Sequence, residues 1–69
     1  MKRRAVIKRL QDEAKARGLA FDITELTRHT AIKIGKTSRT LGRHTEVDDL
    51  TAHKFWNQFD DEFGKGWWR

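Results

Sequence analysis

The spacing of apolar residues changes twice along this 69-residue chain, and each change predicts a different kind of element. Between residues 3 and 17, apolar side chains recur about every four positions, as they do on one face of a helix. They are Val6, Ile7, Leu10 and Ala14. From Leu19 the repeat shortens to two, which is typical of strands, and after residue 45 it returns to a helical spacing. This order predicts an α+β fold.

Three strands are expected between the two helices. The first alternates Leu19, Phe21 and Ile23 against more polar neighbours, the second covers residues 28–34, and the third covers residues 38–41. Short connections between them favour an antiparallel meander.

The turn between the second and third strands decides their register. Gly35 followed by Lys36 suits a two-residue type II′ turn, because glycine readily adopts a positive φ. The resulting pairs are Ile34 with Thr37, Ile32 with Arg39, and Thr30 with Leu41. A four-residue loop would instead pair Ile32 with Leu41. Either loop places Leu41 in the buried row. The two-residue loop also places Arg39 in that row, so Arg39 must lie at a sheet edge and extend its charged end into water.

A second helix is expected to begin at the N-cap Thr45, with Asp48 completing a capping box, and to run to about Phe63, before Gly64. Its apolar stripe predicts core residues. They are Ala52, Phe55, Trp56, Phe59 and Phe63. Residues 1–63 should therefore form a single domain, with both helices on one face of a three-stranded antiparallel sheet and the other face open.

Residues 64–69 form an aromatic tail beyond this domain. Trp67 and Trp68 allow two interpretations: they anchor a partner protein or a second copy of the chain, since tryptophan is enriched at binding hot spots, or they fold back over the seam between helices and sheet to enlarge a small core. The second interpretation is favoured.

Positive charge is concentrated in the first two thirds of the chain. Residues 1–45 hold twelve Lys or Arg against four Asp or Glu, whereas residues 46–69 hold three against six. This distribution predicts a nucleic acid as the partner of the basic part. No stretch resembles a membrane span or the apolar core of a signal peptide, so we expect a cytoplasmic protein with no membrane partner.

The candidate site is built around His29, which falls in the row of the second strand that faces away from the expected core. In an antiparallel hairpin the start of this strand lies beside the end of the next, so His29 should come near Gly42, Arg43 and His44. RNA cleavage without a metal needs a base, an acid and cations that stabilise the phosphorane. We therefore predict His29 and His44 as catalytic residues, and no metal or other cofactor. The cations expected to bind RNA are Lys8, Arg9, Arg28, Lys33, Lys36, Arg39 and Arg43.

These residues resemble the HicA family of toxin ribonucleases from HicA/HicB toxin-antitoxin systems. The likeness runs from the basic helix start at residues 1–7 to Phe59, and residues 41–44, Leu-Gly-Arg-His, resemble the family's Val-Pro-x-His segment. His29 matches the catalytic histidine of the family motif Gly-Ser-His-His, although the flanking residues here are Thr27, Arg28 and Thr30. The resemblance implies a double-stranded-RNA-binding-like fold, cleavage of mRNA without a metal, and inhibition by a HicB-like antitoxin.

Two other functions fit the same residues. A non-catalytic module of this fold would bind RNA through its cations, with no need for His29. A protein-interaction domain would instead use the aromatic tail and the acidic second helix.

Overall fold

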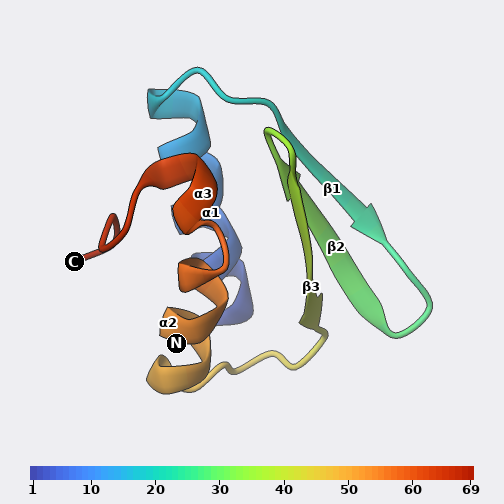
Figure 1. Ribbon diagram of the computed structural model, residues 1–69. Helices are drawn as coiled ribbons and strands as arrows, with labels where there is room; N and C mark the ends of the chain where they lie inside the picture. The colour runs from blue at the N-terminus through green and yellow to red at the C-terminus, as the bar shows by residue number, and fades with distance from the viewer.

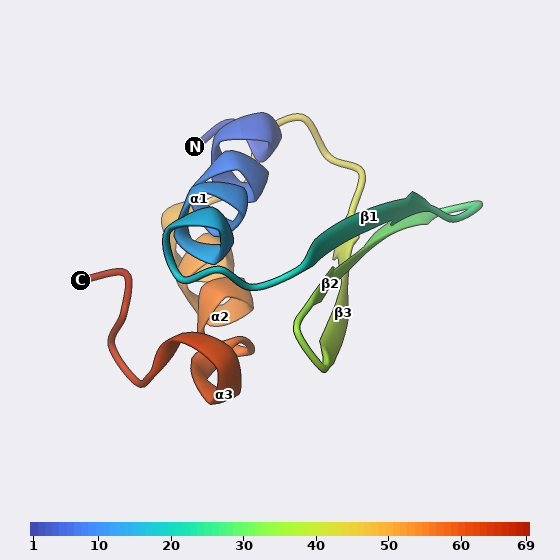
Figure 2. The same ribbon diagram turned by 90° about the horizontal axis from the view of Figure 1, so that it is seen from above.

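The computed structural model describes all 69 residues as two layers, a helical layer and a three-stranded antiparallel sheet (Figures 1 and 2). The elements are α1 (Arg3–Ala16), β1 (Phe21–Glu25), β2 (His29–Ile34), β3 (Thr37–Gly42), α2 (Asp49–Asn57) and α3 (Asp60–Phe63). All three helices lie on one face of the sheet, and no helix covers the other face. The expected α-β-β-β-α order is confirmed, with a short third helix added.

The core lies between the two layers. Helix α1 contributes Val6 and Leu10, the sheet contributes Ile32 and Ile34, and Phe59 completes the centre, all five at 0% exposure. The aromatic stripe of the second helical segment is buried as expected. Its helix is not continuous, however, because the amides of Gln58 and Phe59 bond to the third residue before each, which tightens the chain and ends α2 at Asn57.

The strand register is the one expected for the two-residue loop. Strand β2 pairs with β3 so that Ile34 faces Thr37 and Thr30 faces Leu41, which excludes the four-residue alternative. Gly35 has a φ of +58° and no non-glycine residue has a positive φ, the sign pattern of a type II′ turn. Arg39 shares the row of Ile32 but is exposed, because β3 is an edge strand.

The expected N-cap at Thr45 is wrong. The carbonyl of Thr45 accepts a hydrogen bond from the Arg3 amide at 2.8 Å, the amide of Val47 donates to the Met1 carbonyl at 2.8 Å, and Lys2 and Glu46 form an isolated antiparallel bridge. This pairing keeps residues 45–47 extended, so a helix cannot begin there. The side chain of Asp48 caps α2 instead, accepting from the Thr51 amide at 3.2 Å.

The aromatic tail packs on the outer side of the helical layer, away from the sheet (Figures 1 and 2). The indole of Trp67 donates to the Trp56 carbonyl at 3.1 Å, and that of Trp68 donates to Asn57 at 2.8 Å and stacks on His53 with ring centroids 4.2 Å apart. The tail thus enlarges the core, but along the helices rather than at the helix–sheet seam.

Candidate nucleic-acid interface

Two histidines flank a glycine at one end of the sheet. His29, the first residue of β2, is exposed and pairs directly with Gly42, the last residue of β3. Residues that pair directly project to the same face, and the row of His29 alternates with the buried row of Thr30 and Ile32. A Cβ atom placed on Gly42 would lie 3.5 Å from Cδ2 of His44. His44 thus lies next to Gly42, and the expected pairing of the start of β2 with the end of β3, His29 opposite Gly42, is confirmed.

The smaller of two cavities adjoins His44. It has a volume of about 170 Å³, and its lining includes Gly42, His44 and the carboxylates of Glu46 and Asp48. Hydrogen bonding to Lys2 holds the pKa of Glu46 below its usual range, and hydrogen bonding to the Thr51 side chain does the same for the pKa of Asp48. Both carboxylates are thus stabilised in their charged form, and Glu46 is in addition paired with Lys2.

The predicted RNA-binding cations separate into three groups. Arg28 and Arg43 lie at the same end of the sheet as His29, and Lys33 is an exposed residue of the same row of β2. Lys36 and Arg39 are both separated from His29. Lys36 follows β2, which spans ~17 Å from His29 at the usual rise per strand residue. Arg39 pairs with Ile32 and therefore belongs to the row opposite that of His29.

The remaining two cations, Lys8 and Arg9, belong to α1 and thus to the helical layer. Each is paired one helical turn away, Lys8 with Asp12 at 2.9 Å and Arg9 with Glu13 at 3.0 Å, and the Arg9 guanidinium also lies 5.0 Å from the ring centroid of Trp67. The structure does not bring Lys8 and Arg9 together with His29.

An ionic cluster that the sequence analysis missed holds the His29 end of the sheet together. Nε of Arg3 donates to the Gly42 carbonyl at 3.3 Å, and its guanidinium also donates to the buried hydroxyl of Thr30. That hydroxyl in turn donates to Glu25 at 2.6 Å. The Glu25 carboxylate lies 3.7 Å from Arg3 and 3.4 Å from Arg43, which also donates to the Leu26 carbonyl.

A sequence signal for this cluster does exist. Helix α1 begins with Arg3 and Arg4 and has no acidic residue in its first turn. Cations are disfavoured at that end of a helix because they oppose its dipole. Such a placement indicates that the charges are used by contacts outside the helix.

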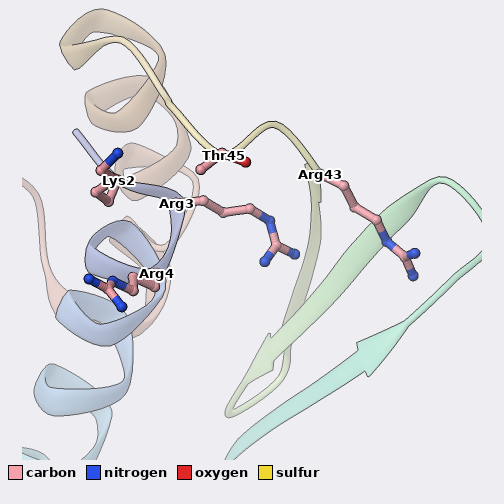
Figure 3. Close-up of a pocket in the computed structure, with 5 residues that line it drawn as sticks. All are labelled: Lys2, Arg3, Arg4, Arg43 and Thr45. Atoms are coloured by element: carbon pink, nitrogen blue, oxygen red, sulfur yellow. The ribbon is translucent and has the colours of Figure 1, made fainter.

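The larger cavity lies beside this cluster, between the start of α1 and the end of β3 (Figure 3). Its volume is about 410 Å³, and none of its lining residues is apolar. They are Lys2, Arg3, Arg4, Arg43 and Thr45.

Comparison with known protein families, curated proteins and solved structures finds no match for this chain. The likeness to HicA toxins thus rests on the sequence motifs alone. None of the helices is both long and apolar enough to cross a membrane.

Proposed function

We propose that the protein is an endoribonuclease that cuts RNA by histidine acid–base chemistry, with His29 as the principal catalytic residue. The observation that carries the proposal is that two exposed histidines adjoin Gly42 at one end of the sheet: His29 pairs with it, in the row that no helix covers, and His44 lies beside it. A strand of RNA needs this kind of open, basic face to bring a phosphodiester to two imidazoles.

In the proposed reaction, one imidazole removes the proton from a ribose 2′-hydroxyl, and the 2′ oxygen attacks the adjacent phosphorus. The bond to the 5′ oxygen of the next nucleotide breaks, and the second imidazole, in its protonated form, gives its proton to that oxygen. The products are a 2′,3′-cyclic phosphate and a free 5′-hydroxyl. Arg28 and Arg43 stand at the same end of the sheet and would stabilise the extra negative charge of the phosphorane.

The test is cleavage of a labelled, unstructured RNA by purified protein in EDTA, comparing the parent with His29→Ala and His53→Ala. His53 is the matched control, because it belongs to α2 in the helical layer and stacks on Trp68. We expect His29→Ala to lose at least about 100-fold in rate, the usual contribution of an acid–base group, and His53→Ala to cut like the parent. Circular dichroism checks that each variant is folded. Parental cleavage by His29→Ala would overturn the assignment.

A second candidate, an RNA-binding module without catalysis, is favoured by one observation. Neither the His29 imidazole nor the His44 imidazole has a hydrogen-bond partner within the chain. Catalytic histidines are commonly oriented by such a partner, which also fixes their tautomer. In this case RNA binds and remains intact, and His29→Ala leaves its affinity unchanged.

The proposal extends to the cell as a toxin that cuts cytoplasmic mRNA and is held inactive by a HicB-like antitoxin. The sequence resemblance around His29 supports this extension. Induced expression in bacteria tests it: the parent should arrest growth and His29→Ala should not. Equal growth of the two cultures, at equal protein levels, would argue against the toxin role.

A further inference from the structure

We propose that the cavity lined by Lys2, Arg3, Arg4 and Arg43 binds backbone phosphates of the RNA strand that is cut at His29. The inference rests on the proposed function and adds a second part to its binding site. None of Lys2, Arg3 and Arg4 was among the cations expected to touch RNA.

The charge of the cavity favours an anion. Its four cations face two nearby carboxylates, Glu46 beside Lys2 and Glu25 beside Arg3 and Arg43. Two positive charges therefore remain without compensation. The Arg4 side chain makes no hydrogen bond or ion pair within the chain and the residue is exposed, so its guanidinium is free for a ligand.

The lining favours phosphate over a nucleobase. No apolar or aromatic side chain faces the cavity, so a base finds no ring to stack on. Guanidinium and ammonium groups, together with the Thr45 hydroxyl, offer hydrogen-bond donors to phosphate oxygens. Contacts of this kind position a nucleic acid without reading its sequence.

The arrangement of the cations fits a chain of phosphates better than a single ion. In Figure 3, Arg3 and Arg43 extend in the same direction over the sheet, and both reach the Glu25 carboxylate. Lys2 and Arg4 lie on the helix side of the same cavity. The charges are thus spread along the cavity instead of converging on one point.

Gly42 links this cavity to the histidines. Its carbonyl accepts from Arg3, and its Cα pairs with His29 on the neighbouring strand. Arg43 is the next residue along the chain and lines the cavity. Arg3 and Glu25 meet at Thr30, in the row that faces the helices, whereas His29 lies in the opposite row. An RNA strand that occupies the cavity would therefore pass around this end of the sheet to reach His29.

Other basic residues are less suited to the same strand. Lys8 and Arg9 are paired with carboxylates of α1, and the start of α2 carries Asp48 and Asp49. The cavity keeps an excess of positive charge at the His29 end of the sheet, where Arg28 also makes no ion pair.

The test measures how RNA affinity depends on salt, with Lys2→Gln and Arg4→Gln combined in one variant. Arg3 and Arg43 are left intact because they hold the sheet end together. The matched control is Lys15→Gln with Lys65→Gln, two exposed cations that make no ion pair within the chain and lie away from the cavity. All proteins carry His29→Ala, so that an oligouridine probe stays intact during the titration.

Two lost phosphate contacts should reduce the slope of log K against log salt by about 1.4, at roughly 0.7 per single-strand phosphate. Affinity at low salt should fall about tenfold or more, whereas the control pair should leave the slope almost unchanged. Equal slopes for the two double variants would overturn the proposal. Oligouridine with and without a 5′-phosphate should bind equally; binding that requires the 5′-phosphate would indicate a terminal phosphate site and overturn the backbone assignment.

Cleavage assays with His29 restored separate this inference from the proposed function. Removing Lys2 and Arg4 should raise KM and leave kcat unchanged, since these contacts are made equally before and during the reaction. If the parent cuts RNA and the variant keeps the parental KM, the cavity assignment fails and the ribonuclease stands. If the parent never cuts RNA but the variant lowers the salt slope, the ribonuclease fails and the cavity assignment stands.

Discussion

Replacing Gly35 by alanine should destabilise the hairpin that sets His29 opposite Gly42. Gly35 has a φ of +58°, and an added Cβ would collide with the carboxylate of Glu62, coming within 2.9 Å of its Cδ. The same carboxylate accepts hydrogen bonds from the Lys36 amide at 3.3 Å and the Thr37 hydroxyl at 2.7 Å. Helix α3 thus supports the turn through Glu62.

The expected cost has two parts. Holding alanine in a left-handed conformation costs about 1–2 kcal/mol relative to glycine. Displacing Glu62 removes two hydrogen bonds, worth about 1 kcal/mol each. The sum is about 3–4 kcal/mol, which corresponds to a fall of roughly 12–32 °C in Tm for a domain of this size.

Gly18→Ala is the matched control, because Gly18 has a φ of +68° and nothing lies within 4 Å of its added Cβ. Urea unfolding followed by circular dichroism should show a loss of only about 1–2 kcal/mol for this variant. In a Glu62→Ala background, the cost of Gly35→Ala should fall to the same value. The reasoning is refuted if Gly35→Ala and Gly18→Ala are equally destabilising, or if removing Glu62 leaves the cost of Gly35→Ala unchanged.

Two further outcomes are expected. Gly42→Ala should fold with slightly higher stability, by about 0.5–1 kcal/mol, because its Cβ meets His44 at an ordinary 3.5 Å. In Gly42→Phe, the added ring should separate His44 from His29 and lower the rate of RNA cleavage at least tenfold. Parental cleavage by Gly42→Phe would count against joint action of the two histidines. Hydrogen bonding to Arg17 holds the pKa of Glu13 below its usual range in the folded protein. The stability that ionised Glu13 contributes is therefore complete above the unfolded pKa of about 4.3, and it is lost as the pH falls through the lower pKa of the folded state. Glu13→Gln should therefore be less stable than the parent at neutral pH and lose less stability on acidification, as urea unfolding between about pH 3 and 7 would show; an unchanged pH dependence would contradict this.

The parts of the fold that the sequence predicted depend on short-range patterns. Alternation in β2 and a glycine at position 35 narrowed the hairpin to two even-length loops, and the structure has the shorter one, which brings His29 to Gly42. Both signals lie within a few residues of the structure they determine.

The parts that were missed depend on contacts between distant residues. Nothing local to Thr45 indicates that residues 45–47 pair with residues 1–3, so a sequence with good capping chemistry was assigned to the wrong helix start. The same pairing brings Lys2 and Arg3 toward Arg43, and the cationic cavity exists only because of it. For the aromatic tail, packing against the domain could be predicted from composition, but the choice of the helical layer could not.

The position of that tail has an optical consequence. All three tryptophans of the chain, Trp56, Trp67 and Trp68, gather in the helical layer, and their indoles bond to Val6, Trp56 and Asn57 respectively. No indole lies on the open face of the sheet. Intrinsic fluorescence therefore reports whether the tail is docked on α2, and an emission shift during a titration at the His29 face would signal a rearrangement through the whole molecule, not local contact with the added ligand.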